Sequence, residues 1–173
     1  MNNTVSYPLF EVPVEVRETL AMLRSTGAHV YLAGGALRDL VLGEKPNDYD
    51  VFVISESPEE TDNLHTELVL SGFVQQHSAS YDSEGYLADY RNGDVNVIIY
   101  ANTPYKNIVE LVEGFDLNMN MFLYDDIEEI EVQNVVGWTP DKPVKVHNRL
   151  KSMRVNDRIF RFKQRYPNLK WDV

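Results

Sequence analysis

Two carboxylates two residues apart, Asp48 and Asp50, open the apolar run DYDVFVI, residues 48–54. Side chains on a strand alternate between faces, so both carboxylates are expected on one face while Tyr49 and Val51 point to the other. Carboxylates that share a face repel each other unless a cation neutralises them, and such pairs can hold divalent metal ions. The spacing therefore predicts a Mg²⁺ site at the start of a strand, with a solvated strand entrance as the alternative.

A glycine pair, Gly34 and Gly35, precedes the helical pattern ALRDLVL, residues 36–42. Glycine lets backbone amides approach a ligand closely, and the first turn of a helix offers unpaired N–H groups at its positive dipole end. Arg38 lies one turn into this helix and adds a permanently charged group suited to phosphate. A tight turn alone would need the same glycines. Combined with the nearby carboxylate pair, however, the corner predicts a site for a nucleoside triphosphate and its metal ions.

A longer pattern contains both features. The stretch GGALRDLVLGEKPNDYDVFV, residues 34–53, resembles the signature of the head domain of class II tRNA CCA-adding enzymes and bacterial poly(A) polymerases. These enzymes belong to the DNA polymerase β-like nucleotidyltransferase superfamily. The matching positions are Gly34, Gly35, Arg38, Asp39, Gly43, Asp48 and Asp50. The resemblance covers about residues 28–165 and does not include the helical domains that clamp tRNA in that family.

A second segment supports the resemblance. DLNMNMFLYD, residues 116–125, is similar to another motif of the family at Asp116, Asn120, Tyr124 and Asp125. In the family, two arginines that help to recognise the nucleotide precede this motif. Here Gly114 and Phe115 stand in their place.

The resemblance implies a reaction and a set of residues. An NMP would be transferred from an NTP, either ATP or CTP, to an acceptor hydroxyl with the help of two Mg²⁺ ions or Mn²⁺. Asp48 and Asp50 would be catalytic and would hold both metals. The implied nucleotide-binding residues are Gly34, Gly35, Arg38, Asp39, Asp116 and Asn120. The acceptor suggested by the family is an RNA or tRNA 3′ end, and a protein or small-molecule acceptor stays open.

A third acid of the family is expected on the strand GDVNVIIY, residues 93–100, where Asp94 and Asn96 share one face. The flanking Val95 and Val97 align the family position with Asn96. An amide cannot take a proton from an attacking hydroxyl. We therefore expect Asp94 to complete the site as the third catalytic and metal-binding residue.

The charge distribution divides the chain. Residues 142–173 hold ten of the sixteen Lys and Arg, whereas the first 141 residues carry six basic and twenty-five acidic groups. We therefore predict a nucleotidyltransferase head domain at 1–141 and a basic amphipathic helix or arm at 142–173, folded back over the acidic head. The apolar face of this helix is Val155, Ile159, Phe162 and Tyr166, and the basic stripe is Arg154, Arg158, Arg161 and Arg165. Arg158 and Arg161 are the predicted substitutes for the missing nucleotide-binding arginines, and a salt-bridged surface is the alternative.

Periodicity predicts an α+β fold, a mixed polymerase β palm-like sheet with helices mainly on one face. The predicted helices lie at about 13–26, 36–42, 58–71, 103–112 and 146–166. The predicted strands lie at 29–33, 48–54, 73–77, 86–90, 95–100, 121–125 and 129–136, the last two as a hairpin. The loop 78–85 is polar.

Composition limits the alternatives. The chain has 173 residues, a net charge of −11 and no cysteine, which excludes a disulfide framework and a thiolate zinc site. The four histidines show no metal-ligand spacing. No apolar run approaches the length of a membrane span, so we expect no membrane partner and a cytoplasmic protein, in a host cytoplasm if a phage encodes it. The sequence carries no signal for an oligomeric state.

Two other function classes compete with the enzyme. Asn96 and the absent arginine pair favour a catalytically inactive protein of the same fold that binds a nucleotide or another protein. The basic arm favours an interaction module that docks on a partner.

Overall fold

The computed structural model describes residues 4–7, 11–78, 85–125, 131–147 and 152–173. No helix in these ranges is long and apolar enough to cross a membrane.

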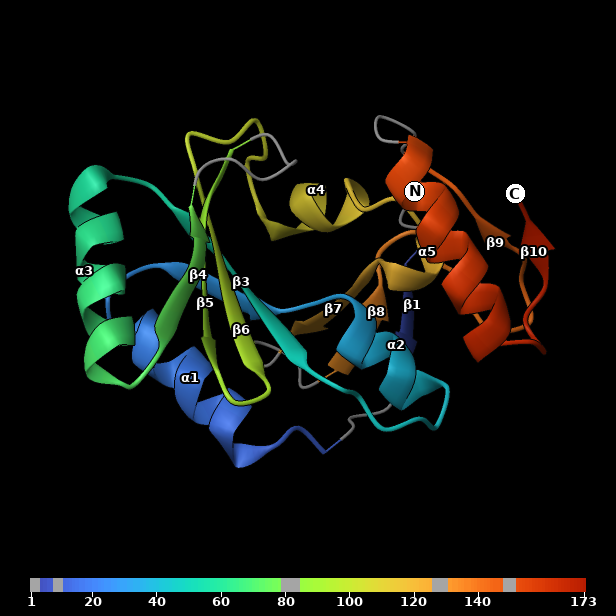
Figure 1. Ribbon diagram of the computed structural model, residues 1–173, viewed down its shortest axis with the longest axis horizontal. Helices are drawn as coiled ribbons and strands as arrows, with labels where there is room; N and C mark the ends of the chain where they lie inside the picture. Colours follow the sequence, from blue (N-terminus) through green and yellow to red (C-terminus); the bar gives the residue numbers. More distant parts are fainter. Residues whose placement is uncertain (1–3, 8–10, 79–84, 126–130, 148–151) are drawn as a thin grey trace.

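A five-stranded mixed sheet organises the first half of the chain (Figure 1). In order across the sheet, its strands are β2 (His29–Leu32), β3 (Tyr49–Ser55), β6 (Val95–Ala101), β5 (Tyr86–Asn92) and β4 (Val74–Ser78). The central strands β3 and β6 run parallel, and every other neighbouring pair is antiparallel. Residues 51–55 are buried, because β3 is central and covered on both sides.

Two helices, α1 (Val14–Arg24) and α3 (Pro58–Leu70), lie on one face of this sheet (Figure 1). Their buried residues recur at helical spacing and join one core cluster with the sheet: Val16, Leu20 and Leu23 from α1, and Leu64 and Leu68 from α3. Ser57 caps α3, since its hydroxyl accepts a hydrogen bond from the Glu60 N–H, and Pro58 opens the helix. These features confirm the predicted helices and the predicted fold class.

The other face of the sheet is partly covered. The short helix α4 (Ile108–Glu113) packs there against Phe52, Ile54 and Tyr100 in a second core cluster. Beside the sheet stand α2 (Gly35–Val41), the 3₁₀ turn η1 (Asn118–Asn120) and a three-stranded sheet of β1 (Val5–Tyr7), β8 (Glu131–Asn134) and β7 (Phe122–Asp125). β7 and β8 pair antiparallel, which confirms the predicted hairpin pairing, and the residues 126–130 between them lie outside the described residues.

The C-terminal part packs on this body. It comprises β9 (Val144–Lys145), α5 (Ser152–Arg165) and β10 (Trp171–Asp172). Val144 and Tyr166 belong to the main core cluster, with Ile159 and Phe162 against it. The predicted apolar face of the helix therefore faces the body, as expected. The division at residue 141 stays a prediction.

Two helix starts were predicted too early. α4 begins at Ile108 instead of 103, because Asn107 in extended conformation accepts the Glu110 N–H and caps it. α5 begins at Ser152 instead of 146, because 144–145 form β9 and Val146 bridges Leu117. The polar loop predicted at 78–85 falls mostly on 79–84, outside the described residues.

Candidate active site

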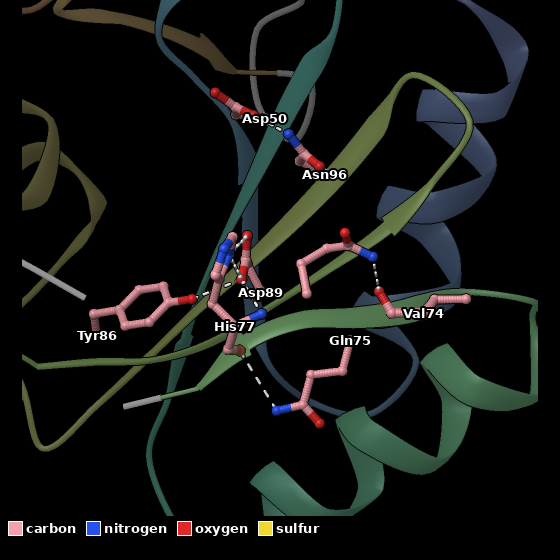
Figure 2. Close-up of polar contacts among 8 residues, drawn as sticks. Asp50, Val74, Gln75, His77, Tyr86, Asp89 and Asn96 are labelled. Atoms are coloured by element: carbon pink, nitrogen blue, oxygen red, sulfur yellow. Dashed lines mark hydrogen bonds and ion pairs between the residues drawn. The ribbon is translucent and has the colours of Figure 1, made fainter. Parts of the chain in front are cut away.

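The carboxylate pair lies at the start of the central strand. Asp48 immediately precedes β3, and Asp50 is its second residue. The parallel register pairs Asp50 with Asn96 of β6, and the Asn96 Nδ2 donates a hydrogen bond of 3.2 Å to Asp50 Oδ1 (Figure 2). Asp48 Oδ2 lies 3.9 Å from the guanidinium of Arg91 on β5. Within the described ranges, the two acids thus have one neutral donor and one distant cation as partners, which leaves their mutual repulsion largely uncompensated.

Burial, and after it the negative charge of Asp48, raise the pKa of Asp50 to about 6, although the hydrogen bond from Asn96 opposes the shift. A carboxylate that resists ionisation beside a second carboxylate is a group that a divalent cation would stabilise. The chemistry of this donor pair therefore fits a hard cation such as Mg²⁺.

Asp94 lies elsewhere. It occupies the two-residue turn Gly93–Asp94 between β5 and β6, exposed, with its carbonyl accepting the N–H of Tyr49. Within the ranges that the structure describes, no three His, Cys, Asp or Glu side chains are grouped closely enough to hold a metal ion. The structure thus differs from the expectation that Asp94 would join Asp48 and Asp50. The reason is the register, which places Asn96 opposite Asp50 and leaves Asp94 in the turn.

The raised pKa of Asp50 predicts an unusual pH dependence. The folded-state pKa of Asp50 exceeds the ordinary value of 3.8. Between about pH 4 and pH 6, the native protein therefore holds a proton on Asp50 that the unfolded chain has lost. The stabilisation that comes from this tighter proton binding is fully present below about pH 4 and is lost as the pH rises through about 6. Without divalent cations, Asp50→Asn should therefore be more stable than the wild type at pH 7, with the difference closing near pH 4. Urea denaturation at both pH values measures this.

A divalent cation should make the wild type more stable than Asp50→Asn at pH 7. Millimolar Mg²⁺ should stabilise the wild type at pH 7 and leave Asp50→Asn unchanged, because ligands that bind the native state raise its stability. Equal stability of the two proteins at pH 7, together with no response to Mg²⁺, would contradict the carboxylate pair as a cation site.

The glycine corner joins β2 to α2. Gly34 has a φ of +86°, a left-handed conformation that favours glycine. Its N–H is already bonded to the Phe122 carbonyl at 2.9 Å, and a Cβ at this position would lie 3.7 Å from the ring of Phe115. Phe115, one of the two residues that stand in place of the arginine pair, therefore has its aromatic ring beside the glycine corner at Gly34. Phe115 also lies 5.4 Å, centroid to centroid, from Phe52.

We expect Gly34→Ala to cost about 1–2 kcal/mol of unfolding free energy, since an L-residue is strained at this φ. Gly27 is the matched control because it has a φ of +90° and nothing within 4 Å of a built Cβ. Chemical denaturation should give similar losses for both alanine variants. A loss at Gly34 much larger than that at Gly27 would contradict this account, because a Cβ 3.7 Å from the ring of Phe115 is in ordinary van der Waals contact and adds no clash.

Arg38 is buried, with 4% of its surface exposed. Its side chain folds back over Gly35, where a Cβ would lie 3.2 Å from the guanidinium. Nε and Nη2 donate to Asp39 Oδ1 at 3.0 and 2.9 Å, and Nη1 donates to Asn120 Oδ1 at 2.6 Å. The guanidinium also lies 4.6 Å from the ring centroid of Phe162 in α5. Three predicted nucleotide-binding residues, Arg38, Asp39 and Asn120, are thus brought together as partners of one another.

The arm completes this cluster. Arg165 Nη2 donates to Asp39 Oδ2 at 2.9 Å, and the hydroxyl of Tyr166 donates to Asp39 Oδ1. Burial and this hydrogen bond raise the pKa of Tyr166 to about 12. The buried carboxylate of Asp39 in α2 therefore links α2 to the C-terminal end of α5 through hydrogen bonds from Arg165 and Tyr166.

The remaining predicted nucleotide-binding residues differ in whether the structure gives them partners. Arg158 forms an ion pair with Asp116, whose other oxygen, Oδ1, is buried and has no hydrogen-bond partner among the residues that the structure describes. Arg161 is exposed. Binding of a nucleotide by Arg158 and Arg161 stays a prediction. Arg158 already neutralises the carboxylate of Asp116, which is itself a predicted nucleotide-binding residue.

Sequence reasoning missed a polar cluster on the same face as Asp50. Asp89 of β5 accepts hydrogen bonds from the Tyr86 hydroxyl at 2.7 Å and the His77 N–H at 2.9 Å (Figure 2). His77 Nδ1 lies 3.1 Å from the same oxygen. Asp89 also contributes to the raised pKa of Asp50. The alternation Asp89, Arg91 along β5 was the available signal, since both residues share one strand face.

Comparisons with solved structures define the fold. The apo form of a CCA-adding enzyme superposes with a TM-score of 0.64 at 20% identity, covering 94% of this chain and 41% of that one. The Thermotoga maritima CCA-adding enzyme complexed with tRNA also gives 0.64 at 20% identity, covering 94% and 40%. The fold is therefore that of the head domain of a nucleotidyltransferase.

Sequence comparison adds the family. The chain is 26% identical over 136 residues to the CCA-adding enzyme of Streptococcus pneumoniae serotype 19F (strain G54), covering 70% of this chain and 32% of that protein. Poly(A) polymerase I of Salmonella typhi is 25% identical over 139 residues, covering 72% and 30%. The chain thus spans about a third of the curated relatives that it matches. The model of the Gabija anti-defense 2 (Gad2) family matches residues 12–148, so the chain belongs to that family.

Proposed function

We propose that the chain binds a nucleoside triphosphate with Mg²⁺ and transfers its NMP to an acceptor hydroxyl, which loses its proton to solvent while pyrophosphate leaves. The observation that carries this proposal is the carboxylate pair Asp48 and Asp50 at the start of the central strand. The pKa of Asp50 is raised, and among the residues that the structure describes no cation lies closer to the pair than 3.9 Å. These two side chains would hold the cation. When bound, it would neutralise charge on the phosphates and lower the pKa of the attacking hydroxyl.

The residues around the pair have supporting roles. Asn96 donates to Asp50 and so fixes the carboxylate, but its amide supplies no negative charge for a second ion. The guanidinium of Arg91, on a partly exposed side chain, is a cation near Asp48 that could contact a phosphate oxygen. In the described part of the chain, one buried oxygen of Asp116 has no hydrogen-bond partner, so it could accept a hydrogen bond from a sugar hydroxyl.

The solved relatives support a choice of nucleotide and acceptor. Solved complexes of CCA-adding enzymes with ATP, CTP and tRNA share this fold. ATP or CTP is therefore the proposed donor, and an RNA or tRNA 3′ end is the proposed acceptor.

Incubation with Mg²⁺, each radiolabelled NTP and a pool of RNAs tests the proposal. Label should enter RNA with ATP or CTP and should be lost with EDTA. Saturable NTP binding, measured by equilibrium dialysis, with no transfer to any RNA would contradict the enzyme.

The second candidate is a protein of the same fold that counteracts Gabija defence without nucleotidyl transfer. Two observations favour it: membership of the Gad2 family, and an amide, Asn96, hydrogen-bonded where a third carboxylate would stand. If it is correct, a Gabija-protected bacterial strain that expresses Asp48→Asn/Asp50→Asn should lose protection as fully as one that expresses the wild type. Restoration of protection by the double substitution would instead link the anti-defence effect to the carboxylates.

A further inference from the structure

An open cavity of about 660 Å³ lies on the opposite side of the sheet from Asp48 and Asp50. It is bounded by the first half of α1, by the segment before β3 and by the turn Gly93–Asp94. Tyr49, between the two carboxylates in sequence, lines it because alternate residues of a strand point to opposite faces. The volume is within the range of about 300–1,000 Å³ that small-ligand sites occupy.

The floor of the cavity is apolar. It is formed by buried or partly buried side chains from α1, β3, β6 and the residue before β4: Val16, Met22, Tyr49, Val95 and Phe73. Such a floor would accept an apolar stem of a few methylene groups. The Tyr49 ring adds a face to which a cation is attracted.

The rim of the cavity carries charged side chains. Glu15, Glu18 and Asp94 are three exposed carboxylates that line the cavity, and Lys45 is the cation among the lining residues. None of these four forms an ion pair within the described part of the chain. The Tyr49 hydroxyl likewise makes no hydrogen bond there. The rim therefore has an excess of two negative charges beside a free hydroxyl.

We propose that this cavity binds a guanidinium or ammonium group carried on a short apolar stem. The stem would lie on Val16 and Phe73, and the cation would lie between the Tyr49 ring and the carboxylates of Glu15 and Glu18. The acidic head, with its large excess of carboxylates over basic groups, raises the local concentration of such a ligand. The same chemistry is presented by a free organic amine and by a lysine or arginine side chain of a partner protein.

The site is independent of the proposed transfer reaction. Its side chains lie on the face covered by α1, whereas Asp50, Asn96 and Arg91 lie on the other face. Binding can therefore be measured without nucleotide, Mg²⁺ or acceptor, and failure of one proposal leaves the other standing.

The test uses n-butylguanidinium as the probe and n-butylurea, its neutral analogue of the same size, as the control. In ¹H–¹⁵N spectra of the whole chain, the guanidinium should shift the amides of Tyr49, Phe73 and Val95 saturably, with a Kd in about the millimolar range expected of so small a ligand. Butylurea should bind at least about fivefold more weakly. Equal binding of the two compounds would overturn the proposal.

Variants separate a defined site from general attraction to an acidic surface. Glu15→Gln/Glu18→Gln should weaken binding about fivefold, since each exposed charge contributes a factor of roughly two to five. Glu59→Gln/Asp62→Asn on α3 is the matched control, because these two exposed acids have the same spacing and lie outside the cavity. The same loss in both double variants would overturn the proposal.

A third arm identifies the source of the cation. Acetyl-Gly-Arg-Gly-amide should shift the same three amides if the cavity receives a side chain of a partner protein. Shifts with butylguanidinium but not with the peptide would support a free organic cation instead. Absence of shifts with both compounds would overturn the proposal.

Discussion

Asp50→Asn is expected to lower the rate of nucleotidyl transfer by roughly 1,000-fold. A bound cation contributes several kcal/mol of charge stabilisation to such a transfer, and about 1.4 kcal/mol corresponds to a factor of ten in rate. Asp48→Asn should have a similar effect, because both carboxylates are needed to hold the ion. Single-turnover transfer of labelled NMP, with substrate and Mg²⁺ saturating, measures the effect on the reaction itself.

Asp94→Asn is the informative comparison. The turn position of Asp94 and the absence of a three-carboxylate group in the described ranges predict a transfer rate within about threefold of the wild type. A loss comparable to that of Asp50→Asn would show that Asp94 reaches the metal during the reaction. In that case the arrangement of acids expected from the sequence would be correct.

Asp39→Ala is expected to destabilise the fold by about 3–5 kcal/mol. The substitution leaves the guanidinium of Arg38, only 4% exposed, without its carboxylate in a buried site, and removing one partner of a buried pair has this cost. It also removes the acceptor of Arg165 and Tyr166, so α5 loses its attachment to α2. Urea denaturation followed by far-UV circular dichroism gives the free energy.

Two milder variants calibrate this result. Tyr166→Phe should cost about 1 kcal/mol, the usual contribution of one hydrogen bond. Arg165→Gln should cost less than about 1 kcal/mol, because 35% of that side chain is exposed. A cost for Asp39→Ala no greater than that of Tyr166→Phe would show that the cluster does not stabilise the attachment of α5.

Much of the head could be predicted from the sequence because its signals are local. Val16, Leu20 and Leu23 repeat at helical spacing, Ser57 and Glu60 form a cap, and the run after Asp50 is apolar on both faces. The shared face of Asp48 and Asp50 follows from strand alternation alone.

The remaining features depend on partners distant in sequence. Asp39 meets Arg165 across 126 positions, so no local pattern shows that this carboxylate is neutralised by the arm. The turn at Asp94 depends on the register of β5 with β6, and the start of α4 depends on a single cap at Asn107. Phe115, beside the glycine corner, is separated from it in sequence by β3, β6 and α4, so no local pattern shows that the two are neighbours.

A crystal structure with Mn²⁺ and a non-hydrolysable ATP or CTP analogue, measured at an anomalous wavelength, tests the central claim most directly. We predict an anomalous peak within coordination distance of Asp48 and Asp50, with the triphosphate on the same ion. A nucleotide bound with no anomalous peak at these two carboxylates, or Asp50 still held by Asn96 alone, would contradict it.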